Sequence, residues 1–369
     1  MLQDLLILGA VSLLVDSLFS ASKWFIIFGS FYFSALVTGT FLHFQHPGFR
    51  WETYVIGIAL ISFGSLLNKS SIPSGKLLMV IEGHESAVTA VAFSPDASFI
   101  ASGSKDSSVR IWEVASGKQV CVLQGHNGSV NAVSFNSDGT LLASVSSDES
   151  IRIWRMPSGR LFKVLRINQR YIGGPQSLAW HPKRIELVCS CGWGTRPVIW
   201  RWNESLRTVT NDVTASMVAY GGNGSIIAFA DQRKKVYVMK NNQLETLHKA
   251  KGSVIAFEPG GYLLAVANEN PLEGHRNSIS MWNCESGQRV VKLRGHMKDI
   301  TSLSFEPESS LLASGSRDQR IAIWNWDLRK REYYLRGHTE AVNTVCFCAK
   351  GRLLASGGDD TTIRLWQVY

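Results

Sequence analysis

Serine, histidine and aspartate recur together in this chain, and these three residue types are the components of a hydrolase triad. In such a triad the aspartate orients the histidine, which takes the proton of the serine hydroxyl. A triad requires one reactive centre, whereas this set recurs four times at nearly constant spacing. The repetition favours a structural role in every repeat, and the sequence predicts that the chain is not an enzyme.

The cysteines are the second group of residues with possible chemistry. There are six of them, namely Cys121, Cys189, Cys191, Cys284, Cys346 and Cys348. Two pairs have the spacing Cys-x-Cys, which places both side chains on the same face of one strand and differs from the Cys-x-x-Cys pairs of a zinc site. The pattern favours buried free thiols in a reducing compartment. No phosphate-binding loop or paired acidic site stands out, so we expect no cofactor and no metal.

The recurring set lies in four segments that align without gaps. Each segment opens with Gly-His and ends with a tryptophan 28 residues after the histidine. The segments are Gly83–Trp112, Gly125–Trp154, Gly295–Trp324 and Gly337–Trp366. The first two histidines are 42 residues apart, as are the last two, and the 170 residues between His126 and His296 leave room for three degenerate repeats.

Three weaker copies fill that interval and bring the total to seven repeats. The first contains SLAWHPKRIELVC and ends at Trp200, and the third contains SVIAFEPGGYLLAVA and ends at Trp282. The second contains SMVAYGGNGSIIAFA, keeps Asp231 and has Tyr237 where the tryptophan is expected. Each repeat reads as four short strands separated by turns rich in Gly, Asn, Asp and Pro. Four strands in a period of about 42 residues predict the blades of an all-β propeller.

The register of the repeats predicts how the ring closes. The chain ends in a third strand, TTIRLWQVY, with no fourth strand after it. The segment 76–81, KLLMVI, lies before the first Gly-His, where a fourth strand belongs. We expect it to complete the last blade, so that residues 76–369 form a closed seven-bladed propeller without free sheet edges.

Over about 295 residues the sequence resembles the WD-repeat family. In that family a hydrogen-bonded tetrad of His, Ser or Thr, Asp and Trp ties each blade together. The resemblance assigns these tetrads to His84, Ser102, Asp106 and Trp112; His126, Ser144, Asp148 and Trp154; His296, Ser314, Asp318 and Trp324; and His338, Ser356, Asp360 and Trp366. The resemblance departs in repeats three to five, which lack the Gly-His pair.

The same resemblance indicates where partners would bind. The residue before the tetrad aspartate usually faces the top of the propeller in this family, which gives Lys105, Ser147, Arg317 and Asp359 as candidate partner contacts. Solvated turn residues are the equally weighted alternative. Most propellers of this family bind other proteins, although the fold alone does not establish that role.

The N-terminal part differs sharply in composition from the repeats. Residues 24–42 contain no charged side chain, and a helix of that length would span the bilayer core. Pro47-Gly48 indicates a turn, and residues 53–67 form a second, shorter apolar stretch. The sequence therefore predicts a helical membrane segment over 1–68, with a span at 24–42 and a second one at 53–67, followed by a linker over 69–75. A buried soluble helical hairpin is the alternative.

Charge gives an expectation for orientation and partners. The chain carries a formal net charge of +9; the part before residue 68 sums to −1, so the remainder carries about +10. Lys23, Lys69 and Lys76 would lie on the propeller's side of two spans and Arg50 in their loop, so the positive-inside rule predicts a cytoplasmic propeller, or one on the equivalent stromal or matrix side.

These patterns predict a membrane-anchored scaffold for protein–protein interaction, one form of which is a structural subunit of a larger membrane protein complex. Its partners would be proteins, including membrane-protein subunits. One alternative is a transient recruiter or sensor that docks soluble partners at a membrane. A nucleic-acid-binding propeller is the other alternative, and the short tether of about seven residues to the membrane disfavours it.

Overall fold

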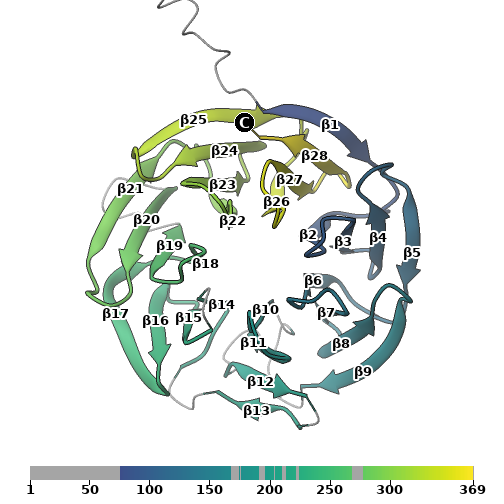
Figure 1. Cartoon of the computed structure of the whole chain (residues 1–369), viewed down its shortest axis with the longest axis horizontal. Helices are drawn as coiled ribbons and strands as arrows, with labels where there is room; N and C mark the ends of the chain where they lie inside the picture. The colour runs from purple at the N-terminus through teal and green to yellow at the C-terminus, as the bar shows by residue number, and fades with distance from the viewer. Residues whose placement is uncertain are drawn as a thin grey trace, which may run out of the picture. The chain divides into compact units, whose positions relative to one another are not determined.

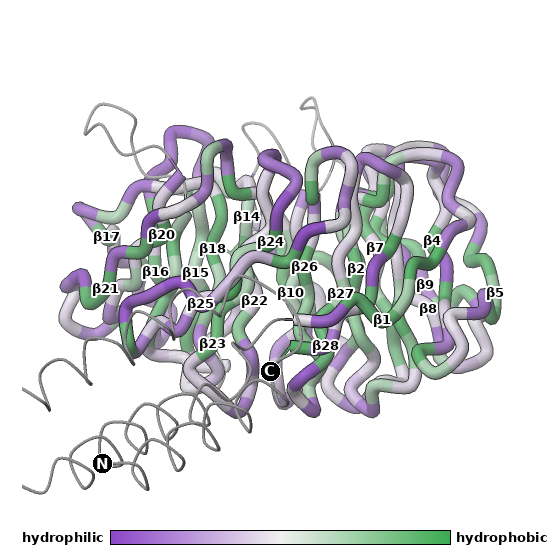
Figure 2. Tube along the Cα trace, turned by 90° about the horizontal axis from the view of Figure 1, so that it is seen from above, coloured by the Kyte–Doolittle hydropathy of each residue, from purple (hydrophilic) through white to green (hydrophobic). Residues whose placement is uncertain are grey.

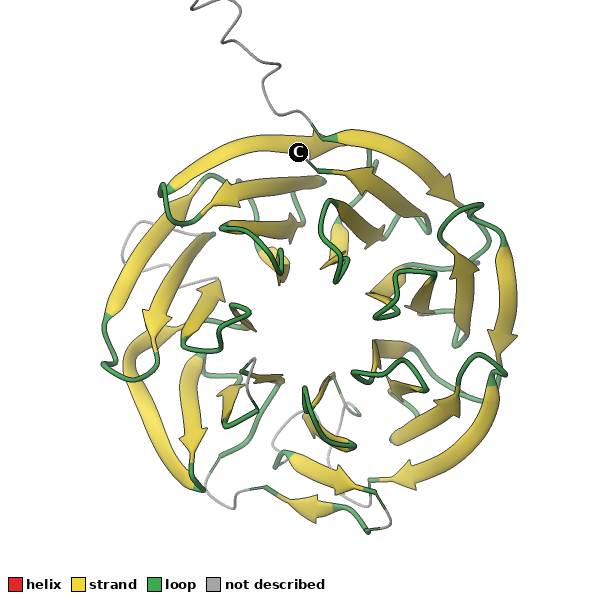
Figure 3. Ribbon diagram, viewed as in Figure 1, coloured by secondary structure: helices red, strands yellow, loops and turns green. Residues whose placement is uncertain are grey.

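The computed structural model describes residues 75–167, 174, 176–190, 196–202, 204–209, 213–221, 224–267 and 277–368. They form seven antiparallel four-stranded sheets, which are arranged as blades around a common centre (Figure 1). Throughout these ranges the chain consists of strands, turns and loops, without a helix (Figure 3). The expected seven-bladed all-β propeller is confirmed.

The blades follow one another in chain order, and each runs from an inner to an outer strand. Blade 1 contains β2 (Val88–Phe93), β3 (Phe99–Ser104), β4 (Val109–Glu113) and β5 (Gln119–Leu123). Blade 2 contains β6 (Val130–Phe135), β7 (Leu141–Ser146), β8 (Ser150–Arg155) and β9 (Arg160–Arg166). Blade 3 contains β10 (Ser177–Trp180), β11 (Glu186–Ser190), β12 (Val198–Arg201) and β13 (Arg207–Thr208). Blade 4 contains β14 (Met217–Tyr220), β15 (Ile226–Ala230), β16 (Lys235–Lys240) and β17 (Gln243–Lys251).

The remaining three blades lead back to the start of the ring. Blade 5 contains β18 (Val254–Phe257), β19 (Leu263–Ala267), β20 (Ser278–Asn283) and β21 (Arg289–Arg294). Blade 6 contains β22 (Ile300–Phe305), β23 (Leu311–Ser316), β24 (Arg320–Asn325) and β25 (Lys330–Arg336). Blade 7 contains β26 (Val342–Phe347), β27 (Leu353–Gly358), β28 (Ile363–Gln367) and, as its outer strand, β1 (Lys76–Ile81).

The two ends of the described chain meet in blade 7. Strand β1 pairs antiparallel with β28, with Lys76 opposite Gln367 and Ile81 opposite Ile363. The strand that precedes the first repeat thus supplies the outer edge of the last blade. Pulling β1 away would expose the backbone of β28, so this pairing fastens the ring.

The N-terminal expectations concern residues that lie outside the described ranges. The chain divides into two compact units, Met1–Ile72 and Pro73–Tyr369, and the second unit is the propeller. The helical segment 1–68, its spans at 24–42 and 53–67, and all of the linker except residue 75 fall among the residues that are not described. Within the described ranges, no helix is long and apolar enough to cross a membrane.

The core lies between neighbouring blades. Hydrophobic residues run along the strands and hydrophilic residues gather in many of the connecting turns (Figure 2). The second strand of each blade is almost wholly buried, and small residues there let the next blade approach closely. A Cβ atom on Gly103 would lie 2.5 Å from Val130 Cγ1 of the next blade, and one on Gly357 would lie equally close to Val88. This close packing restricts the movement of the blades relative to one another, and with it the movement of the turns that carry the tetrads.

Candidate functional site

The four residues of the first tetrad lie in direct contact. His84 Nδ1 is 2.7 Å from Asp106 Oδ2, and His84 Nε2 is 2.7 Å from Ser102 Oγ. Trp112 Nε1 donates a hydrogen bond of 2.8 Å to the same serine oxygen. Because a carboxylate can only accept, His84 donates through Nδ1, and its Nε2 then accepts the serine proton. Every polar group of the set is satisfied.

The same arrangement recurs in blades 2, 6 and 7. The His Nε2–Ser Oγ distances are 2.8, 2.7 and 2.8 Å, and the Trp Nε1–Ser Oγ distances are 2.9, 2.8 and 2.8 Å. The structure therefore brings together all sixteen residues that the WD-repeat resemblance assigns to tetrads, namely His84, Ser102, Asp106, Trp112, His126, Ser144, Asp148, Trp154, His296, Ser314, Asp318, Trp324, His338, Ser356, Asp360 and Trp366.

Burial and ionisation show what these sets can do. Burial lowers the pKa of His84 and of His126, which keeps both imidazoles neutral. Burial alone would raise the pKa of Asp106, but hydrogen bonds from Ser108 and His84 outweigh it and bring that pKa to about 2. The tetrad serines are fully buried. A substrate cannot reach their hydroxyls, so these four sets hold blades together and do not act as nucleophiles.

Blades 3 and 5 keep the tryptophan but lack the tetrad around it. Leu187 pairs with Trp200, and Leu264 pairs with Trp282, as Ile100 pairs with Trp112 in blade 1. Counting two residues onward, Cys189 and Val266 stand where blade 1 has Ser102. The indole nitrogens of Trp200 and Trp282 are buried and have no hydrogen-bond partner among the described residues.

Blade 4 differs from the alignment made on the sequence. Ile227 pairs with Met239, so Met239 and not Tyr237 occupies the tryptophan position. The nitrogen of Asp231 donates to the carbonyl of Lys235, as that of Ser104 does to Ser108, so Asp231 is the counterpart of Ser104 and not of the tetrad aspartate. Assigning Asp231 and Tyr237 to a degenerate tetrad was wrong, because the hairpin turn of this blade lies two residues later in the sequence than the alignment assumed.

The four candidate partner contacts occupy equivalent turns. In each case the backbone nitrogen donates to the carbonyl of the residue eighteen positions earlier, at 2.9–3.0 Å. Lys105, Ser147 and Arg317 are exposed, whereas Asp359 is half-buried. Lys105 Nζ lies 3.9 Å from Asp359 Oδ1, which links blade 1 to blade 7.

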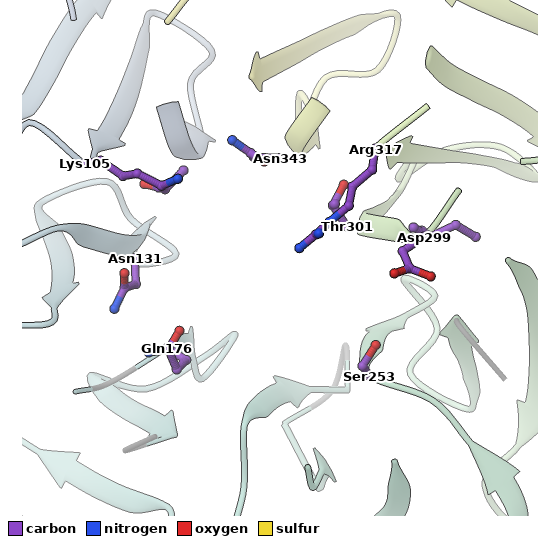
Figure 4. A pocket seen from close by; sticks show the side chains of 10 residues that line it. Lys105, Asn131, Gln176, Ser253, Asp299, Thr301, Arg317 and Asn343 are labelled. Atoms are coloured by element: carbon purple, nitrogen blue, oxygen red, sulfur yellow. The ribbon is translucent and has the colours of Figure 1, made fainter. Parts of the chain in front are cut away.

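Two of these four residues line a cavity at the centre of the ring. It measures about 380 Å³, and its lining includes Lys105, Arg317 and Asp299 (Figure 4). Ser147 and Asp359 are not part of that lining. Arg317 is exposed and forms no ion pair within the described ranges, so its charge is available to a bound molecule.

Sequence reasoning missed the polar residues of the inner strands that line the same cavity. They are Thr89, Asn131, Thr301 and Asn343. Thr89 donates to the carbonyl of Val130 in the next blade, and Asn343 donates to the carbonyl of Val88. Each of these polar residues follows the first apolar residue of its inner strand, in VTAV, VNAV, ITSL and VNTV. That recurrent polar position was the available signal.

The cysteines and the possible metal ligands are the remaining candidates for a chemical role among the described residues. Of the described cysteines, Cys121, Cys284, Cys346 and Cys348 are free thiols, and burial raises the pKa of Cys284 to about 12 and that of Cys346 to about 11. Over the same ranges, no group of three or more His, Cys, Asp or Glu side chains is arranged to hold a metal ion.

Comparison with known proteins gives relatives with diverse names. Periodic tryptophan protein 2 homolog of Schizosaccharomyces pombe is 38% identical over 69 residues, 19% of this chain and 8% of that protein. The transcriptional corepressor LEUNIG_HOMOLOG of Arabidopsis thaliana is 24% identical over 231 residues, 61% of this chain and 23% of the relative. Probable cytosolic iron-sulfur protein assembly protein 1 of Vanderwaltozyma polyspora is 58% identical over 40 residues, 11% of this chain and 12% of the relative. The chain thus spans less than a quarter of the length of each.

The family comparison coincides with the tetrads. The WD domain, G-beta repeat, matches residues 75–113, 117–155, 287–325 and 329–367. Each match contains one complete tetrad, of blade 1, 2, 6 or 7, in the order His, Ser, Asp and Trp, and each ends one residue after the tetrad tryptophan. Four blades are therefore WD repeats, and the described residues form a seven-bladed β-propeller.

Proposed function

We propose that this chain is a scaffold for protein–protein interaction, attached to a membrane by residues 1–68 and without chemistry of its own. Its propeller lies on the cytoplasmic side, or the equivalent side in an organelle. It serves as a subunit of a larger membrane complex. WD-repeat propellers are generally interaction scaffolds. The relatives include a protein named as a corepressor and one named as an assembly protein, and these two names do not point to a common catalysed reaction.

The observation that carries this proposal is the contrast between sealed tetrads and an open polar cavity. The tetrads bury the groups that could act as nucleophile and base. The central cavity is instead lined by Lys105, Arg317 and Asp299 (Figure 4). Lys105 and Arg317 each precede a tetrad aspartate, which accepts a hydrogen bond from a backbone nitrogen of the same turn. Rigid, charged and accessible turns are suited to holding a partner.

The membrane attachment is supported by the sequence alone. Residues 24–42 carry no charge, and the positive charges around the two apolar stretches favour a cytoplasmic propeller. Small residues such as Gly29, Gly39 and Gly57 would permit close packing against helices of other subunits.

Pull-down in mild detergent tests both parts of the proposal. The full chain is compared with a version that starts at Ser70, and with the full chain carrying Arg317→Glu. If partners remain with the full chain but are lost from the shortened version, the hydrophobic segment belongs to the assembly. Loss of partners from Arg317→Glu assigns docking to the cavity. A full chain that is soluble without detergent would contradict the membrane attachment, and a full chain without partners would contradict the scaffold.

A further inference from the structure

The outer rim of the ring is unusual between blades 2 and 3. The outer strand of blade 3, β13, has two residues, whereas the outer strands of the other blades have five to nine. Strand β9 of blade 2 lies next to it at the rim (Figure 1). A short outer strand covers less of the neighbouring strands, so side chains of β9 and of the end of β12 remain accessible here.

Aromatic and cationic side chains form a stack at this place. The rings of Phe162 and Trp202 are parallel, with centroids 5.0 Å apart and an interplanar angle of 8°. The guanidinium of Arg155 lies 4.7 Å from the Phe162 ring centre. Trp202 also contacts Trp200, yet 40% of its surface is exposed. A large ring held in place on one face and open to solvent is a typical anchor for a protein partner.

Apolar and positively charged residues surround this stack. Leu161 is 45% exposed and Val164 is 37% exposed on β9. Arg155, Arg160 and Arg166 are exposed as well, and none of them forms an ion pair within the described ranges. We call the six residues Arg155, Arg160, Leu161, Val164, Arg166 and Trp202 the rim patch.

Among the described residues, the carboxylates near the rim patch do not neutralise its arginines. Glu186 is buried and engaged by Arg201 at 2.5 Å and by the Tyr220 hydroxyl at 2.6 Å. Glu204 pairs with Arg207 at 3.6 Å. On the outer strand of blade 6, by contrast, Lys330 pairs with Glu332 at 3.2 Å. The positive charge of the rim patch is therefore left for a molecule outside the chain.

We propose that the rim patch binds an acidic, extended segment of a partner protein whose apolar side chains contact Leu161, Val164 and Trp202. Charge complementarity requires carboxylates opposite the three arginines. The exposed leucine and valine favour a peptide over a nucleic acid, because a phosphate backbone offers nothing apolar to them. This inference rests on the proposed scaffold role and adds a second docking place, on the rim instead of the central cavity.

Peptide binding by the full chain in nonionic detergent tests the inference. The probe is a fluorescent peptide of about twelve alternating glutamate and leucine residues, long enough for one extended strand. The comparators are a glutamate–serine peptide and an oligothymidylate. We expect the glutamate–leucine peptide to bind most tightly, and R160E/R166E to weaken it about tenfold or more. Trp202→Ser should weaken it about threefold or more while the melting temperature of the propeller stays close to wild type.

The matched control is R289E/R294E on β21, the outer strand of blade 5. Arg294 lies opposite Ser278 as Arg166 lies opposite Ser150, and both arginines of the control are exposed. The control should change binding less than twofold. An equal loss in the control, a tighter oligothymidylate or a peptide that does not bind would each overturn the rim patch. The pull-down separates this from the scaffold role, since partners kept by R160E/R166E but lost by Arg317→Glu would refute the rim patch and leave the scaffold intact.

Discussion

Blades 1, 2, 6 and 7 hold their tryptophans differently from blades 3 and 5. In the first group the indole nitrogen donates to a serine that a histidine and an aspartate hold in turn. In the second group the tryptophan is buried equally well, but its nitrogen has no hydrogen-bond partner. An unpaired buried donor costs about 1–3 kcal/mol. Burial alone therefore holds the indole at this position of the blade, whereas a hydrogen bond to its nitrogen adds to the stability of the blade.

Blade 3 obtains polar contacts from its neighbours. Trp180 Nε1 donates to the carbonyl of Ser134 in blade 2 at 2.9 Å, and Tyr220 of blade 4 donates to Glu186. Hydrogen bonds from Tyr220 and Arg201 lower the pKa of Glu186 although burial would raise it, so the carboxylate stays charged at the junction of blades 3 and 4. Blades with tetrads have an internal hydrogen-bonded set in addition to hydrogen bonds to neighbouring blades, whereas blade 3 has the bonds to its neighbours without a tetrad. We expect blades 3 to 5 to open first.

The largest effect on this comparison should come from removing a tetrad aspartate. Asp360 accepts from His338 Nδ1, from the nitrogen of Thr339 and from Thr362. Asp360→Ala leaves the buried Nδ1 of His338 without its acceptor and removes the partner of Thr339 and Thr362, so we expect a loss of about 3–5 kcal/mol in the free energy of unfolding. Asp231→Ala in blade 4 is the control, because this aspartate has no tetrad histidine. Urea denaturation measures both, and a similar loss in both would show that the tetrad has no special weight.

Removing a tetrad hydroxyl should have the next largest effect. Ser314 Oγ lies 2.7 Å from His296 Nε2 and accepts from Trp324 Nε1 at 2.8 Å. Ser314→Ala leaves both nitrogens buried without a partner, so we expect a loss of about 2–4 kcal/mol. Val266→Ala at the same register position of blade 5 removes only methyl groups and should cost about 1–3 kcal/mol. If thermal unfolding of Ser314→Ala matched wild type, the hydroxyl would not be holding the blade.

Replacing tryptophan by phenylalanine should separate packing from hydrogen bonding. Trp324→Phe and Trp282→Phe leave similar voids, but only the first loses a hydrogen bond, to Ser314. We expect Trp324→Phe to be more destabilising than Trp282→Phe by about 1 kcal/mol. Trp324→Phe loses a hydrogen bond, whereas Trp282→Phe removes a buried N–H group that had been desolvated without gaining a partner. Denaturation of the two variants under one set of conditions gives the difference. Equal losses would mean that packing alone fixes these tryptophans.

The regular blades and their closure were predictable because one periodic pattern sets both. The constant spacing from His84 to Trp112 and in three other segments determines blade length, strand order and tetrad contacts at once. The strand 76–81 was placed correctly by counting the strands of each repeat. The last repeat lacks a fourth strand and the first is preceded by one too many, so the extra strand takes the vacant outer position of the last blade.

Blade 4 and the rim could not be predicted, for a different physical reason. Without a Gly-His or a tryptophan, alternation alone does not fix the register, and Met239 could take the tryptophan position because any large apolar side chain fills it. The stack of Phe162 on Trp202 joins two blades, and no spacing within one repeat encodes such a contact. The cavity-lining Thr89 and Asn343 were missed because a single polar residue in a strand is an ordinary surface feature until the ring brings the blades together.

Installing the missing hydroxyl in blade 3 should give a smaller, opposite effect. Cys189 occupies the register position of Ser102, next to a tryptophan whose nitrogen has no partner. Cys189→Ser introduces an acceptor for Trp200 Nε1, and we expect a gain of about 0.5–1.5 kcal/mol. Cys189→Ala is the control without an acceptor and should be neutral or destabilising. The idea fails if hydrogen exchange in blade 3 is no slower in the serine variant than in the alanine variant.

Mild acid should produce the smallest difference between the two groups of blades. Burial lowers the pKa of His84 and His126 below the 6.5 that a histidine has in the unfolded chain. Below pH 6.5 the unfolded state therefore binds protons that the folded state does not, so their contribution to stability is present above pH 6.5 and declines as the pH falls through the folded pKa. A second decline should begin below pH 3.8, because Asp106 and Asp148 have pKa values of about 2. Hydrogen exchange, corrected for its intrinsic pH dependence, should show blades 1 and 2 losing protection as the pH falls below 6.5, while blade 5, without tetrad histidines, changes little. An equal loss in blade 5 would assign acid sensitivity to the ring as a whole and not to the tetrads.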